Sequence, residues 1–198
     1  MPLTSIPNLL TLSRILAIPI VIATFYVDGN YVRWFACALF SAAGVTDWLD
    51  GHVARRWSQQ SELGRFLDPI ADKLLVAATL LMLVGTDRLP AGALLPALVI
   101  LCREILVSGL REYLAGLRVG LPVSKLAKWK TAIQMVAIGF LIVGDAGPAF
   151  LPVKDIGGTL LWIAALLTLV TGYDYLRSGL THMARAAPPR HGKPQHLA

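Results

Sequence analysis

Long apolar stretches separated by short polar turns make up most of the chain. Each stretch approaches the roughly 20 residues that an α-helix needs to cross the hydrocarbon core of a bilayer. The pattern predicts an all-α integral membrane protein with six transmembrane helices, at residues 9–27, 32–54, 62–84, 91–113, 126–143 and 156–176. Residues 1–180 would form one membrane domain, and residues 181–198, rich in Pro, Arg, His and Gly, a disordered basic tail.

The composition favours a membrane protein over an unusually apolar soluble helical bundle. Of the 198 residues, 56% are hydrophobic and 15% are charged, whereas a soluble domain carries about 25% charged residues. A soluble bundle is the weaker alternative because the apolar stretches are close to membrane-spanning length.

Basic residues are concentrated in the loops after the second and fourth predicted helices and in the tail, which gives the chain a net charge of +6. The opposite loops carry little beyond Arg33, Arg88 and Lys154. The positive-inside rule therefore predicts that both termini and the two basic loops are cytoplasmic. Basic residues at the ends of apolar stretches suit anionic lipid headgroups, so we expect membrane lipids and no nucleic acid as partners.

Two pairs of aspartates fall near the predicted cytoplasmic side. Asp47 and Asp50 share a helix face at a spacing of three residues, as do Asp68 and Asp72 at a spacing of four. Each would cost about 2.5–3.5 kcal/mol inside a membrane, so something must neutralise them. Four carboxylates facing one polar cavity are hard oxygen ligands that suit Mg²⁺, Mn²⁺ or Ca²⁺. The alternative is that they pair with nearby arginines.

Small and cationic residues lie next to the aspartates. Gly51 and Gly64 allow close approach of a ligand or a neighbouring helix, and Arg55 supplies a cation suited to phosphate. Together with the carboxylates, they predict a pocket for a metal ion and a phosphate-bearing ligand.

The stretch from Asp47 to Asp72 fits the pattern D-x2-D-G-x2-A-R-x8-G-x3-D-x3-D without a departure. It resembles the signature of the CDP-alcohol phosphatidyltransferases. The resemblance implies six membrane helices, a homodimer and a site open to the cytoplasm. It also implies that Asp47, Asp50, Asp68 and Asp72 bind Mg²⁺ or Mn²⁺, and that Asp72 is the general base.

The resemblance further implies a CDP-diacylglycerol donor, with CMP as the leaving group. Outer segments, including the one from Ile6 to Arg14, resemble bacterial members of the family that use glycerol 3-phosphate as acceptor. The implied product is phosphatidylglycerophosphate, made at the bacterial cytoplasmic membrane by a multi-pass enzyme. The donor-binding residues expected from this resemblance are Gly51, Arg55, Ser61, Asn8, Thr11 and Arg14.

A second basic cluster near the cytoplasmic ends of the fourth and fifth helices is a candidate site for the phosphate of the acceptor. Its residues are Arg103, Arg111, Lys125 and Lys130. The alternative is that these charges only set the topology. Two other functions stay open: a related enzyme with another acceptor, making cardiolipin or phosphatidylinositol phosphate, and a membrane transporter that uses the aspartates as an ion path.

Overall fold

The computed structural model describes residues 6–57, 62–116 and 125–186, with the side chains of residues 11–46, 67, 69–116 and 126–181. The predicted all-α fold with six long helices is confirmed. The elements are α1 (Ile6–Thr24), α2 (Asn30–Trp57), α3 (Glu62–Gly85), α4 (Leu94–Gly116), α5 (Lys125–Val143), a short 3₁₀ turn η1 (Gly144–Ala146) and α6 (Val153–Ala186).

Helix α6 is ten residues longer at its C-terminal end than the predicted sixth span. It continues past residue 176 to Ala186 and so includes the first six residues of the predicted tail, 181–186. A helix continues here because proline first interrupts the sequence at Pro188. The rest of the predicted tail, 187–198, lies outside the described residues.

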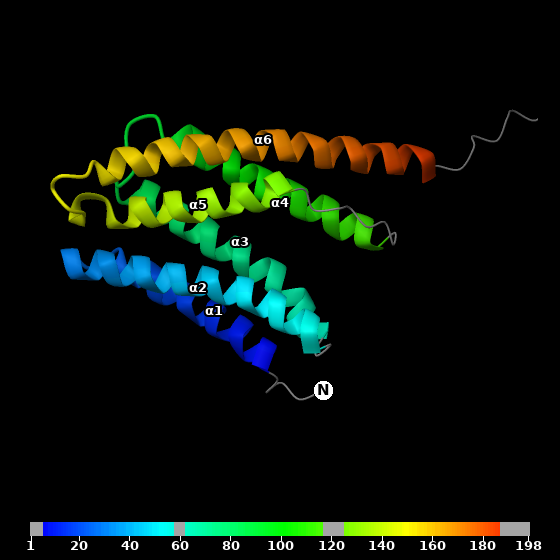
Figure 1. The fold of residues 1–198 in the computed structure, drawn as a ribbon, viewed down its shortest axis with the longest axis horizontal. Coiled ribbons are helices and arrows are strands. Elements are labelled where there is room, and N and C mark those ends of the chain that lie inside the picture. Colours follow the sequence, from blue (N-terminus) through cyan, green and yellow to red (C-terminus); the bar gives the residue numbers. More distant parts are fainter. Residues whose placement is uncertain (1–5, 58–61, 117–124, 187–198) are drawn as a thin grey trace, which may run out of the picture.

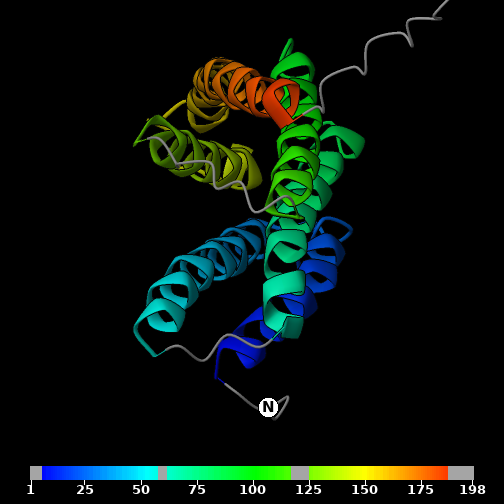
Figure 2. The same cartoon turned by 90° about the vertical axis from the view of Figure 1, so that its right-hand side faces the viewer.

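The helices run back and forth along one long axis (Figure 1). Seen end-on, they form a closed ring in which neighbours in space follow the order α1, α2, α5, α6, α4, α3 and back to α1 (Figure 2). One end of the bundle holds the start of α1 and the end of α6. The helix ends that flank the two predicted cytoplasmic loops lie at the same end. This arrangement agrees with the alternation expected from the loop charges.

The opposite end of the bundle is fixed by the turn that closes α3. The amide of Asp87 donates to the carbonyl of Val84, and the amide of Arg88 donates to that of Leu83. These two bonds, with Asp87 at a positive φ of 53°, form a Schellman motif. The buried Arg88 guanidinium then contacts the carbonyl and the ring of Phe25 at the end of α1. The turn therefore joins the α3–α4 connection to α1.

Close packing of α5 against α6 forms much of the apolar core. Ile138, Leu141 and Leu161 are completely buried there. A Cβ atom at Gly157 would lie 2.9 Å from Cγ of Leu141 and 3.1 Å from Cβ of Phe140. Glycine is required at this position because the two helices approach too closely for a larger residue.

Two of the described helices are long and apolar enough to cross a membrane. They are Leu126–Ala146, with a mean hydropathy of 1.5, and Val153–Thr181, with 1.7. Thr11–Thr24 is apolar but shorter. Helices α3 and α4 carry charged residues within their apolar sequences, among them Lys73, Arg103 and Glu104.

The contact at Gly157 leads to a prediction about stability. Replacing Gly157 with alanine should crowd Leu141 and destabilise the protein by about 1–3 kcal/mol. The apparent melting temperature of the purified protein in detergent should fall by several degrees. Gly109 in α4 is the matched control, because a Cβ there meets nothing within 4 Å in the described structure. Gly109→Ala should leave the melting temperature unchanged or raise it, and equal effects of both changes would contradict the packing argument.

Candidate active site

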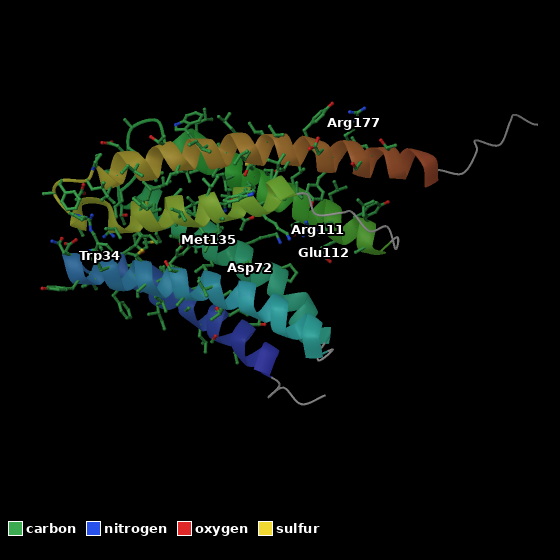
Figure 3. The ribbon with its side chains drawn as sticks, viewed as in Figure 1. Trp34, Asp72, Arg111, Glu112, Met135 and Arg177 are labelled. Carbon is green, nitrogen blue, oxygen red and sulfur yellow. The ribbon has the colours of Figure 1, made fainter. Side chains whose placement is uncertain are left out.

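A cavity of about 1330 Å³ lies between α2 and α5 and reaches α3, α4 and α6. Apolar side chains such as Phe40 and Leu151 line one part. Trp34 lies near one end of the bundle, and Asp72 and Arg111 lie farther toward the other (Figure 3). Among the described lining residues, five cations oppose two carboxylates: Lys73, Arg103, Arg111, Lys128 and Lys130 against Asp72 and Glu104. The excess of positive charge favours an anionic ligand.

Asp72 of α3 forms an ion pair with Arg14 of α1. The distance from Nη1 of Arg14 to Oδ1 of Asp72 is 2.5 Å. Arg14 is 1% exposed, whereas Asp72 is 38% exposed and lines the cavity. A guanidinium this deeply buried needs a partner charge, so Arg14 fixes the position of the carboxylate. The alternative for the aspartates was that they pair with nearby arginines. Asp72 does form such a pair.

Glu104 of α4 binds two cations from different helices. Its Oε1 accepts a hydrogen bond from Nη1 of Arg103 at 3.2 Å and another from Nζ of Lys130 in α5. The side chains of Arg103 and Lys130 are 11% and 5% exposed. The carboxylate neutralises part of the charge of these two buried cations and holds their head groups side by side.

Helix α6 supports the other side of Arg103. Nη2 of Arg103 donates to the hydroxyl of Thr171 at 3.0 Å, and the guanidinium lies 5.8 Å from the ring centre of Tyr175. A Cβ at Gly172 would lie 3.1 Å from Cγ of Arg103. Glycine at this position therefore leaves space for the arginine side chain.

Tyr175 also contacts Arg111, another of the cations predicted to bind the acceptor. Nη2 of Arg111 donates to the tyrosine hydroxyl at 3.4 Å, and the Arg111 guanidinium lies 5.5 Å from the ring centre. One buried aromatic ring thus orients two guanidinium groups through cation–π contacts. Sequence reasoning missed Tyr175, although Thr171, Gly172 and Tyr175 interrupt the apolar face of α6 at one-turn spacing.

Lys73 is a second residue that the sequence did not single out. It follows Asp72, is half-buried and lines the cavity. Its ammonium donates to the carbonyl of Pro69 one turn earlier, at 2.8 Å. The available signal was a lysine next to an aspartate inside an apolar helix, a combination that marks functional sites in membrane proteins.

The structure therefore brings four predicted residues into one cavity: Asp72, Arg103, Arg111 and Lys130. Thr11 and Arg14 are buried on α1. Several other predicted residues lie on described helices, but their side chains are outside the described part: Asn8 on α1; Asp47, Asp50, Gly51 and Arg55 on α2; Asp68 on α3; and Lys125 on α5. Ser61 lies outside the described residues altogether.

The metal site stays a prediction. Among the described side chains, no three His, Cys, Asp or Glu residues come together as a metal site. Three of the four expected ligands, Asp47, Asp50 and Asp68, are not among these side chains. Their helices α2 and α3 do contact each other, so the backbone is compatible with a shared group of carboxylates.

Comparison with known proteins identifies the class. Residues 4–170 match the sequence model of the CDP-alcohol phosphatidyltransferases. The chain belongs to this family, as its signature predicted.

Several relatives have a more specific name, CDP-diacylglycerol–glycerol-3-phosphate 3-phosphatidyltransferase. The protein of that name from Rickettsia typhi is 44% identical over 178 residues, which are 90% of this chain and 98% of the relative. The protein from Cereibacter sphaeroides is 40% identical, over 90% of this chain and 97% of the relative. One of the proteins of this name in Arabidopsis thaliana is 40% identical, over 87% of this chain and 78% of the relative.

The contacts of Glu104 can be tested by removing its charge. Glu104→Gln leaves the buried Arg103 and Lys130 without their shared carboxylate, so we expect a loss of about 3 kcal/mol and a lower apparent melting temperature. The double change Glu104→Gln with Lys130→Met should cost less than the two single changes together. Glu112→Gln is the control, because Glu112 is exposed on the same helix (Figure 3). Strict additivity in the double-mutant cycle would rule out the coupling.

Proposed function

We propose that the chain transfers the phosphatidyl group of CDP-diacylglycerol to glycerol 3-phosphate, giving phosphatidylglycerophosphate and CMP. The observation that carries the proposal is the similarity to proteins named for this reaction over about nine-tenths of the chain. The cavity supports it, because Asp72 and three cations of a kind suited to phosphate, Arg103, Arg111 and Lys130, line the same space. A reaction between two phosphate-bearing substrates needs this combination of charges.

The reaction requires an acceptor hydroxyl to lose its proton as it attacks phosphorus. The oxygen of a primary hydroxyl of glycerol 3-phosphate forms a bond to the phosphatidyl phosphorus, and the bond from that phosphorus to CMP breaks. Asp72 takes the proton of the hydroxyl as general base. Arg14, which pairs with Asp72, orients the carboxylate and adds positive charge on the donor side of the site.

Helices α2 and α3 carry a donor set that fits a hard divalent cation. Asp47, Asp50, Asp68 and Asp72 supply only carboxylate oxygens, which are the ligands that Mg²⁺ and Mn²⁺ prefer. When bound, such an ion would stabilise the negative charge that develops on the phosphate oxygens. We assign Gly51, Arg55, Ser61, Asn8 and Thr11 to the CDP-diacylglycerol side of the site.

Arg103, Arg111 and Lys130 would bind the phosphate of the acceptor, with Lys125 at the start of α5. Guanidinium groups bind phosphate through two parallel hydrogen bonds, so their orientation matters as much as their charge. Tyr175 and Thr171 supply this orientation from α6. Glu104 keeps the cations together before the substrate binds.

The protein would work in the bacterial cytoplasmic membrane, with six membrane-spanning helices, as a homodimer, and with the site open to the cytoplasm. Apolar side chains that face outward support a lipid environment, because water-soluble monomers rarely expose large apolar patches. Examples from three helices are Leu16, Leu98, Ile105 and Leu166, which are 58%, 53%, 63% and 58% exposed. The charged residues of α3 and α4 do not argue against spanning, because those lining the cavity are shielded from lipid.

The proposed reaction is tested by offering several acceptors to the purified protein. With CDP-diacylglycerol and Mg²⁺ or Mn²⁺, only glycerol 3-phosphate should give a phospholipid product, which thin-layer chromatography identifies as phosphatidylglycerophosphate. EDTA should abolish the activity, and added Mg²⁺ or Mn²⁺ should restore it. Product formed from inositol phosphate or phosphatidylglycerol instead would identify a related enzyme with another acceptor, and full activity without a divalent ion would disprove the metal mechanism.

Variants on the two sides of the cavity should have separate effects. Asp72→Asn should lower kcat by about 10²–10⁴-fold while the protein still binds CDP-diacylglycerol. Arg111→Ala should mainly raise KM for glycerol 3-phosphate, because it removes a cation from the acceptor side. Arg177→Ala is the control, since Arg177 is an exposed cation of α6 that does not line this cavity. The measurement is steady-state kinetics with both substrates. Near-normal turnover of Asp72→Asn would remove its role as base.

A further inference from the structure

Gln134 is a buried amide whose oxygen accepts no hydrogen bond within the described part of the chain. It lies on α5, is 3% exposed and lines the cavity. An amide oxygen buried without a donor costs about 1–3 kcal/mol, so it calls for a physical explanation. No step of the proposed reaction uses this side chain.

The position of Gln134 relates it to the predicted phosphate site. It follows Lys130 by four residues, so the two side chains lie on the same face of α5, with Cβ atoms about 5–6 Å apart. Lys130 in turn shares Oε1 of Glu104 with Arg103. Gln134 is therefore one helical turn from Lys130, which Glu104 links to Arg103, and both cations are suited to a phosphate group.

The unused atom of Gln134 indicates the kind of group that it would bind. An amide oxygen only accepts hydrogen bonds, and an ionised phosphate also only accepts them, so the phosphate itself cannot be its partner. A hydroxyl group can donate one hydrogen bond and accept others. Nε of Arg103 is likewise buried without an acceptor in the described structure. A ligand that carries both a phosphate and a nearby hydroxyl would therefore supply partners for both residues.

We propose that Oε1 of Gln134 accepts a hydrogen bond from the middle hydroxyl of glycerol 3-phosphate and thereby determines the acceptor specificity. The proposal rests on the proposed function. The middle carbon is one methylene removed from the phosphate ester, which suits a side chain one turn from Lys130. The primary hydroxyl is the nucleophile and gives its proton to Asp72, so the middle hydroxyl is the donor left for Gln134.

The test compares two acceptors, glycerol 3-phosphate and propane-1,3-diol monophosphate. The second keeps the phosphate and the attacking primary hydroxyl and lacks only the middle hydroxyl. The wild-type protein should prefer glycerol 3-phosphate by about 10- to 100-fold in kcat/KM, because the analogue leaves the buried amide oxygen without a donor. Gln134→Met has a similar length and no hydrogen-bonding group, and should reduce this preference to less than about 3-fold.

Two further variants serve as controls. Gln134→Glu keeps an acceptor oxygen and should retain the preference, although its charge should raise KM for both acceptors. Thr168→Val removes a buried hydroxyl. In the described structure this hydroxyl has no hydrogen-bond partner, and Thr168 does not line the cavity. This variant should keep the wild-type preference. In addition, glycerol 3-phosphate should raise the melting temperature of the wild-type protein more than the diol monophosphate, a comparison that needs no variant.

The possible outcomes separate this inference from the proposed function. If the wild-type protein makes no product from glycerol 3-phosphate, the proposed function fails. If it uses glycerol 3-phosphate but treats both acceptors equally, or if folded Gln134→Met keeps the full preference, only the role of Gln134 is refuted.

Discussion

A positive charge buried between helices must be compensated, and at the centre of the structure carboxylates at the same depth do this. Arg103 and Lys130 come from different helices and are held together by one carboxylate oxygen of Glu104. Arg14 is similarly held by Asp72. The Glu104 contacts, with the bond from Arg103 to Thr171, join α4, α5 and α6, and the Arg14–Asp72 pair joins α1 and α3, so helix packing and the chemistry of the cavity depend on the same contacts. A substitution at Glu104 or Asp72 would change both, and stability and activity must therefore be measured separately.

The constraint also explains why the cavity suits a reaction between phosphate-bearing substrates. The described lining residues contain more cations than carboxylates. Substrate phosphates would balance this excess charge in the bound state. The low polarity of the surrounding helices strengthens each of these interactions relative to water.

Much of the fold could be predicted from the sequence, because six long apolar stretches, each close to 20 residues and separated by short polar turns, favour helices. The order of the helices in the ring could not, since it depends on side-chain packing between distant segments. The end of α6 was placed too early because the prediction followed apolarity, while the helix continues through polar residues until prolines interrupt the sequence. The Schellman motif after α3 was also missed, because Asp87 occupies the position where glycine is the usual signal.

The candidate site was also predicted only in part: local sequence patterns identified some of its residues, but not the contacts between residues far apart in the sequence. Spacing along a helix was enough to group the aspartates in pairs. Clustering of basic residues near the ends of two predicted helices selected Arg103, Arg111 and Lys130, three cations that do line one cavity. The pair between Arg14 and Asp72 joins residues 58 positions apart, and no local pattern contains that contact. Tyr175 was missed for a related reason. An aromatic residue in an apolar helix is usually a core residue, and its role becomes visible only when the two arginines beside it are located.

The contacts of Tyr175 have a consequence for the biogenesis of the protein. Arg103 and Arg111 are both on α4, but the ring that orients them belongs to α6, which leaves the ribosome after α4. Before α6 has been made, the chain already contains both arginines, yet neither has the hydroxyl or ring contacts that fix its direction. The contacts that orient Arg103 and Arg111 therefore form only after α6 has been made, and a nascent chain that stalls before α6 would have an incomplete cavity.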